Sequence, residues 1–160
     1  MVQLVGLLER LGCHSVRTYI QSGNVVFLAN KRNREKLAAE ISATVQANYG
    51  FEPKVILLTA DELLDAMAMN PFDTHDGKAV HVFFMDAAPK YPDMNRLNTL
   101  KNATEAFRLR ERFFYLYTPD GVGRSKLAAN IENCLGVATT ARNWNTLSKL
   151  ASMLDESVNA

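Results

Sequence analysis

The sequence predicts an α+β protein made of two tandem ferredoxin-like (split βαβ) units, with antiparallel sheets and helices on one face of each sheet. Two β-rich runs at 16–20 and 25–27 flank Ser22-Gly23-Asn24, and Gly and Asn tolerate the positive φ of a tight hairpin turn. A second hairpin of similar shape is expected over 105–117. The elements around the two hairpins follow in the same order, which indicates a duplication.

In the first unit, apolar residues at helical spacing predict a helix over 4–11 that ends at Gly12. The hairpin follows, then a second amphipathic helix around 37–45 and a strand over 54–58. This order is the split βαβ arrangement without its opening strand. A linking helix to about Met69 completes the first part of the chain, residues 1–70.

The polar, turn-rich stretch 70–77 separates this part from the second unit, which is assigned to residues 71–160. The second unit follows the complete split βαβ order and adds a C-terminal helix. Its expected elements are a strand over 79–85, a helix over 92–101, the hairpin over 105–117, a helix over 127–135, a strand over 137–140 and a closing helix over 147–154.

Three stretches of the sequence are distinctive: Thr18–Phe27 (TYIQSGNVVF), Gly123–Leu127 (GRSKL) and Thr140–Thr146 (TARNWNT). They closely resemble the signature segments of the bacterial family catalogued as domain of unknown function 1697, and the resemblance extends over about residues 4–155. Members of that family typically open with a strand and a Gly-Ile-Asn-Val-Gly-Gly-like loop, and this chain lacks both. The resemblance implies the fold, a bacterial source and a truncated chain or start site, but no function.

Composition excludes several classes of protein. A net charge of +1 gives no overall attraction to nucleic acid or membrane, so such binding needs a local patch. No apolar run approaches the roughly 18 residues of a membrane span, and no signal peptide is recognised, so a cytoplasmic protein is expected. Cys13 and Cys134 form no metal or redox motif and are interpreted as free thiols.

The first candidate site is Gly121-Val122-Gly123-Arg124-Ser125-Lys126, a loop that runs into a helix. Backbone amides, the helix dipole and the two cations favour an anion there. The glycine spacing is not that of a Walker loop. The alternative interpretation is a plain connection, in which the glycines permit positive φ and Ser125 caps the helix.

The second candidate is Arg142-Asn143-Trp144-Asn145, at the start of the closing helix. Trp144 can stack on a base while Arg142 contacts a phosphate, with Asn143 as N-cap. In the alternative, Trp144 packs into the core and the asparagines bridge backbone groups. The third and fourth strands of a split βαβ unit are parallel, so both candidate segments are expected at one sheet edge.

Apart from these two candidate segments, a second tentative site is expected in the first unit, at its opposite edge and beside the missing loop. It comprises Gln21, Ser22, Gly23 and Asn24. The aromatic residues Phe113, Tyr115 and Tyr117 share one strand face. They could stack on RNA bases, but the RNA-recognition signature is absent, so packing against the other unit is favoured.

Enzymatic signals are sparse. The three histidines have no ligand spacing, no nucleophile elbow or paired-carboxylate pattern occurs, and neither a metal nor a cofactor is expected. His81 is interpreted as a strand residue with a satisfied ring. The sequence thus favours binding of a phosphate-bearing ligand, a nucleotide or nucleic acid. The alternative is a protein-interaction or self-assembly module without ligand chemistry.

Overall fold

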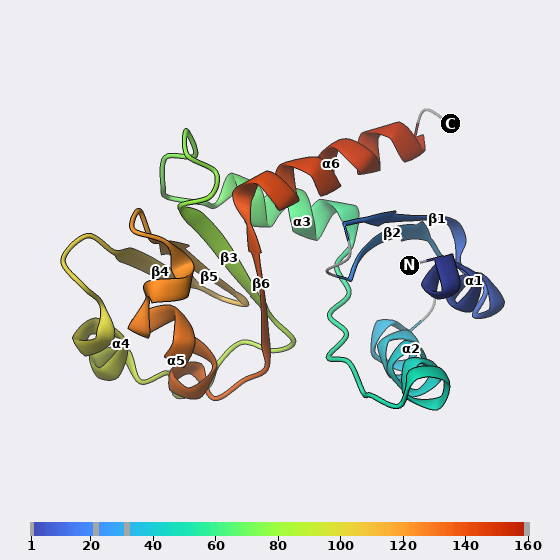
Figure 1. The fold of residues 1–160 in the computed structure, drawn as a ribbon, viewed down its shortest axis with the longest axis horizontal. Helices are drawn as coiled ribbons and strands as arrows, with labels where there is room; N and C mark the ends of the chain where they lie inside the picture. Colours follow the sequence, from blue (N-terminus) through green and yellow to red (C-terminus); the bar gives the residue numbers. More distant parts are fainter. Residues whose placement is uncertain (1, 21–22, 31–32, 159–160) are drawn as a thin grey trace. The chain divides into compact units, whose positions relative to one another are not determined.

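The computed structural model describes residues 2–20, 23–30 and 33–158. Within them the chain is a mixed α+β protein with antiparallel sheets and six α-helices, as expected (Figure 1). The chain forms two compact units: Met1–Ala60 with Lys149–Ala160, and Asp61–Ser148. We call them unit 1 and unit 2 and describe each by itself.

Unit 1 contains two helices and a two-stranded antiparallel sheet. Its elements are α1 (Val2–Arg10), β1 (His14–Tyr19), β2 (Asn24–Leu28) and α2 (Arg34–Tyr49). Gly12 (φ 84°) ends α1 and Gly50 (φ 77°) ends α2, because both adopt the left-handed backbone that glycine tolerates. The hairpin and both helices confirm the pattern read from the sequence.

The prediction of a strand over 54–58, the fourth expected element of unit 1, is wrong: the segment has no regular secondary structure and pairs with no strand among the described residues. In Figure 1 it is the irregular trace between α2 and α3. Val55 and Leu57 still pack against the core, formed by the buried residues Leu7, Leu8, Cys13, Leu37, Ile41 and Val45. A strand needs a neighbour to bond with, and the alternating pattern alone cannot supply one.

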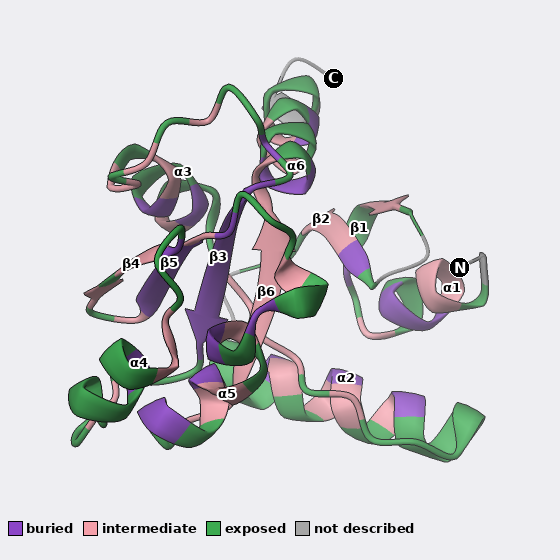
Figure 2. Cartoon of the chain, turned by 60° about the vertical axis from the view of Figure 1, so that its left-hand side comes forward, coloured by how far each residue is buried: buried purple, intermediate pink, exposed green. Residues whose placement is uncertain are grey.

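Unit 2 is built on a four-stranded antiparallel sheet of order β4-β5-β3-β6. Its elements are α3 (Ala60–Ala68), β3 (Val80–Met85), α4 (Met94–Leu100), β4 (Ala106–Arg110), β5 (Phe113–Tyr117), the 3-10 turn η1 (Val122–Arg124), α5 (Lys126–Leu135) and β6 (Thr139–Asn143), followed by the start of α6 (Trp144–Val158). Figure 2 shows that β3 is buried along its whole length, whereas β6 is half-buried.

The last strand lies further along the chain than the predicted 137–140. β6 continues to Asn143, so Arg142 and Asn143 belong to the strand and α6 begins directly at Trp144. The reason is that only alternate residues of an outer strand face the core, here Ala141. The polar composition of residues 139–143 therefore does not prevent them from pairing.

Helices cover both faces of the unit 2 sheet, which corrects the expectation of helices on one face. On one face, Phe83 and Phe114 pack with Leu97 of α4 and Leu127 and Ile131 of α5. On the other face the hydroxyl of Tyr115 donates to the carbonyl of Ala66 in α3, at 2.6 Å. The aromatic strand face is thus covered by α3, the linking helix.

Unit 1 is closed in a similar way by a helix from later in the chain. The second half of α6 belongs to unit 1. There the Arg17 guanidinium forms an ion pair with Glu156 Oε2 at 2.9 Å and donates a hydrogen bond to the Met153 carbonyl. Each unit therefore contains a helix that, in sequence, follows the other unit's sheet.

Candidate functional site

β5 and β6 end at the same edge of the unit 2 sheet. Tyr117, the last residue of β5, lies opposite Val80, and Asn143, the last residue of β6, lies opposite His81. The segment 121–126 follows the end of β5, and the segment 142–145 contains the last two residues of β6 and the start of α6. Because β3 lies between β5 and β6, the strand ends are two strand spacings, about 10 Å, apart.

The segment 121–126 forms a compact turn that opens α5. Gly121 adopts φ 99°, and the N–H groups of Arg124 and Ser125 donate to the carbonyls of Gly121 (3.3 Å) and Val122 (3.1 Å). The Ser125 hydroxyl accepts from the Ala128 N–H at 2.9 Å and so caps the helix. The predicted cap is confirmed, but two of the expected anion-binding amides are used inside the turn.

Anion-binding groups nevertheless remain at this end of α5. The side chains of Arg124 and Lys126 are exposed, while Ser125 is buried. The N–H groups of Lys126 and Leu127 are those of the first turn that α-helix geometry leaves without an intrahelical acceptor. Gly123 does not adopt a positive φ, so the interpretation of both glycines as left-handed holds only for Gly121.

Arg142 lies on the face of the sheet opposite to α5. It pairs with Val82, and the next residue back, Ala141, packs against the cluster that includes α5. Its guanidinium donates to Thr140 Oγ1 at 2.9 Å and to the Ala141 carbonyl at 2.8 Å. The side chain is half-buried, and burial lowers the pKa of Arg142. The strand alternation thus separates Arg142 from Arg124 instead of bringing the two guanidinium groups together.

The remaining residues of the second candidate segment hold the start of α6. Asn143 Oδ1 accepts from the Thr146 N–H at 2.9 Å, which is the expected cap, and the Trp144 N–H donates to the Gly77 carbonyl at 3.1 Å. The Asn145 side chain lies so close to Gly77 that a Cβ there would be 2.1 Å from Asn145 Oδ1. Trp144 is half-buried and Asn145 is exposed.

His81 lies at the same edge of the sheet. The sequence analysis did not select it as a site residue. Only 9% of its surface is exposed, and its Nδ1 has no hydrogen-bond partner among the described residues, so the expectation of a satisfied ring is wrong for this atom. Its neighbours across the ladder are Leu116 and Asn143, and the alternation puts it on the α5 side, as it puts Phe83. Burial lowers the pKa of His81, which keeps the ring neutral at pH 7. The available signal was a lone polar ring in the apolar run VHVFFM.

The second tentative site is described only in part. Gln21 and Ser22 lie outside the described residues. Gly23 adopts φ 76°, as a hairpin turn requires, and Asn24 is buried with its Nδ2 donating to the Tyr19 carbonyl at 3.4 Å. Both described members therefore serve the turn.

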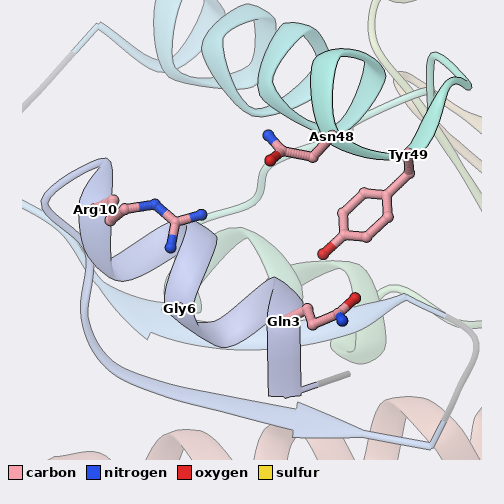
Figure 3. A pocket seen from close by; sticks show the side chains of 5 residues that line it. All are labelled: Gln3, Gly6, Arg10, Asn48 and Tyr49. Atoms are coloured by element: carbon pink, nitrogen blue, oxygen red, sulfur yellow. The ribbon is translucent and has the colours of Figure 1, made fainter.

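Two surface hollows lie away from these segments. In unit 1, a hollow of about 460 Å³ lies between α1 and α2, and Figure 3 shows the side chains of Arg10, Asn48 and Tyr49 extending into it. A hollow of about 400 Å³ in unit 2 is lined by residues of α4 and β4 with Lys101. Neither includes a residue that the sequence analysis selected. The side chains of Gln3, Arg10, Asn48 and Tyr49 around the unit 1 hollow are exposed.

Neither a cluster of metal ligands nor a membrane-spanning helix occurs among the described residues. No three His, Cys, Asp or Glu side chains come together as metal ligands within residues 2–20, 23–30 and 33–158. Over the same part of the chain, every helix is too short or too polar to cross a membrane. Cys13 and Cys134 are both buried, and neither forms a disulfide bond.

Comparison with known proteins finds one matching family and a similar solved structure. The profile of the family described as "Protein of unknown function (DUF1697)" matches residues 1–115. Among solved structures, the conserved bacterial protein SP0830 from Streptococcus pneumoniae is similar, with a TM-score of 0.69 and 20% sequence identity; the match covers 96% of this chain and 88% of that one. The comparison with curated proteins finds no match. The structural likeness shows the fold alone.

Proposed function

The chain belongs to the DUF1697 family, and we propose that it binds a phosphate-bearing ligand, a nucleotide or a nucleic acid, at the N-terminal end of α5. The observation that carries the proposal is a coincidence of two features at one sheet edge. The loop 121–126 leaves the sheet there, and a buried imidazole nitrogen without a partner among the described residues lies in the next strand, at His81.

The first step of the argument is electrostatic. The N-terminus of a helix carries a partial positive charge and presents free N–H groups, which together favour phosphate. α5 is ten residues long and begins at Lys126, with Arg124 just before it; both cations are exposed. Neither side chain has a hydrogen bond or ion pair with another described residue that it would have to give up for a ligand.

The second step concerns hydrogen bonding at His81. A buried polar atom without a partner costs about 1–3 kcal/mol, so such atoms usually mark a bound water or ligand. A neutral imidazole offers one donor and one acceptor, and a phosphate oxygen accepts from the N–H. Asn143, opposite His81 in the ladder, stands at the same edge and face.

Arg142 takes a different role in this proposal from the one the sequence suggested. Its bonds to Thr140 and Ala141 stabilise β6, and Asn143, Trp144 and Asn145 order the start of α6. Asn143 is the residue of β6 that faces the proposed site, while Arg124, Ser125 and Lys126, with Gly121 and Gly123 in the turn, form the proposed ligand-binding side.

We also propose that the two units arose by duplication of a ferredoxin-like unit, with residues 1–70 and 71–160 as the two copies and the opening strand of the first copy missing. The order β4-β5-β3-β6 with antiparallel neighbours supports this for the second copy. The element order α1-β1-β2-α2 followed by the segment 54–58 supports it for the first. We propose in addition that the protein is bacterial and cytoplasmic.

The test is a thermal-shift screen followed by calorimetry, with ATP, AMP, pyrophosphate and a short single-stranded RNA as probes. At least one probe should raise Tm, and its affinity should fall as ionic strength rises, because the cations involved are exposed. Lys126→Ala and Arg124→Ala should each weaken binding about tenfold or more, the scale of a charge-assisted hydrogen bond.

Lys90→Ala is the matched control. Lys90 is an exposed cation that follows the opposite end of β3, so its loss should leave binding unchanged. Absence of binding by all four probes, or an equal loss in the Lys90→Ala variant, would reject the proposed site. The alternative function, a protein-interaction module, would then be the better explanation. The two-stranded sheet of unit 1 favours that alternative.

A further inference from the structure

β4 forms one edge of the unit 2 sheet, and no strand among the described residues pairs with its outer side. Between β3 and β5, the bonds made by the N–H of Thr118 and the carbonyl of Arg112 fall on even-numbered positions, one at each end of β5. Because bonding alternates along an antiparallel strand, the odd-numbered residues of β5 bond β4, and their partners there are residues 106, 108 and 110. The N–H and C=O groups of Phe107 and Leu109 therefore point outward.

The unit 2 hollow of about 400 Å³ runs along this open edge. On the β4 side it is lined by residues 106–109, which alternate between the two faces of the strand. On the other side α4 contributes Met94, which is 38% exposed, and Asn98, with Lys101 just after the helix. A hollow that joins outward-pointing backbone groups to an exposed apolar side chain suits an extended peptide that adds to the sheet as a strand.

The charged residues that line the hollow are all cations. Lys101 and Arg108 line it, and no Asp or Glu does. Arg108 is exposed, its side chain makes no hydrogen bond or ion pair with another described residue, and Arg110 follows on the same strand face. Two carboxylates of the flanking segments, Asp93 and Glu105, each accept from a backbone N–H. The charge at this edge therefore favours a partner with acidic side chains.

We propose that β4 binds an extended segment of a partner protein in which acidic and apolar residues alternate. Each side chain of an added strand lies beside the side chain of the residue opposite it. Phe107 and Leu109 pack on the face that α4 covers, so the residues opposite them should be apolar and contact Met94. The residues opposite Arg108 and Arg110 should be acidic. The proposed interaction depends on neither the phosphate site nor the duplication.

A second copy of this chain does not fit the same edge. Two β4 strands paired edge to edge through the outward groups of Phe107 and Leu109 place Arg108 opposite its own copy, and like charges directly opposite each other are destabilising. The six described strands contain no Asp or Glu, so none of them has the alternating acidic pattern. The occupant is therefore expected in another protein.

The experiment adds the synthetic peptide EVEVEVE, in which glutamate and valine alternate, to the full chain and follows hydrogen exchange by NMR. At saturating peptide, the amides of Phe107 and Leu109 should exchange about tenfold more slowly, or slower still, because they gain ladder bonds. The amide of Arg108 is directed at β5 in the ladder and should change little. The control peptide KVKVKVK has the same capacity for backbone bonds but the opposite charge, and it should give no protection.

Arg108→Glu tests the charge selection. The side chain is exposed, so the variant should fold with an unchanged Tm. It should bind EVEVEVE about fivefold more weakly, or weaker still, and should bind KVKVKVK more tightly than the wild type does. Arg96→Glu is the matched control, because Arg96 is an exposed arginine of α4 that does not line the hollow. It should leave both affinities unchanged.

Three outcomes would overturn the proposal. Slow exchange of the Phe107 and Leu109 amides in the free chain would mean that the edge is already paired. Exchange that EVEVEVE leaves unchanged would mean that no strand adds to β4. Equal protection by EVEVEVE and KVKVKVK would remove the charge selection. Lys126→Ala should leave peptide protection intact, so a failure here is distinguishable from a failure of the phosphate site.

Discussion

The hydroxyl of Tyr115, in the middle of β5, donates to the carbonyl of Ala66 in α3 at 2.6 Å. Tyr115 is fully buried, and its neighbour Phe113 on the same strand face is 7% exposed. This bond joins the sheet of unit 2 to the helix that covers it. The aromatic face is therefore a packing surface in this structure and is not exposed for stacking on bases.

Tyr115→Phe should lower the free energy of unfolding by about 1–2 kcal/mol, because it leaves the Ala66 carbonyl without its donor in a buried place. Urea denaturation measures the change. Tyr91→Phe is the control, since Tyr91 is 93% exposed and should change stability by less than about 0.5 kcal/mol. Equal stability of the two variants would show that the bond contributes nothing.

Alkaline pH should destabilise the protein through the same residue. Burial raises the pKa of Tyr115 to about 12, against 10.0 for an ordinary tyrosine, and Arg110 offsets the rise only in part. The unfolded chain therefore loses this proton first, so stability is complete below pH 10 and decreases by about 2–3 kcal/mol as the pH approaches 12. The difference between wild type and Tyr115→Phe across pH 9–11 isolates the effect; parallel curves would contradict it.

Mild acid should act through His81. Its pKa is lowered from 6.5 by burial, so the folded protein resists the proton that the unfolded chain accepts. The stability it contributes is present above pH 6.5 and is lost as the pH falls below it. His81→Phe should be nearly neutral at pH 7.5 and should flatten the decline between pH 6.5 and 5. A decline of unchanged slope in that variant would assign the acid sensitivity to other groups.

Gly77 and Asn145 should be energetically coupled. An alanine Cβ at position 77 would lie 2.1 Å from Asn145 Oδ1, so Gly77→Ala must displace that side chain and should cost about 1–2 kcal/mol. Asn145→Ala removes the obstructing atoms. The double variant should therefore recover most of the loss, which a double-mutant cycle of unfolding free energies measures. Simple additivity of the two changes would mean that the contact is relieved without cost.

Local chemistry explains what could be predicted from the sequence. Gly12 at the end of α1, Gly23 in its turn and Ser125 at the start of α5 act through their own backbone or side chain, and the sequence predicts all three correctly. The two hairpins could be predicted for the same reason, because their strands and turn residues are close together in the sequence. The proposed duplication was inferred from the order of these elements alone.

What could not be predicted depends on neighbours distant in the chain. The segment 54–58 has the composition of a strand but no adjacent strand, and β6 is a strand although its sequence, TTARN, is polar. The sheet face on which Arg142 lies is set by the pairing register of β6, because a shift of one residue moves a side chain to the other face. Whether His81 Nδ1 finds a hydrogen-bond partner depends on the residues packed around it, and among the described residues it has none.

The exchange of helices between the units has a consequence for synthesis on the ribosome. Domains generally fold in the order in which they emerge. The sheet of unit 1 emerges first, yet the contacts of Arg17 with Met153 and Glu156 need nearly the whole chain to have been translated. The sheet of unit 1 must therefore remain without its contacts to α6 until that helix has been made.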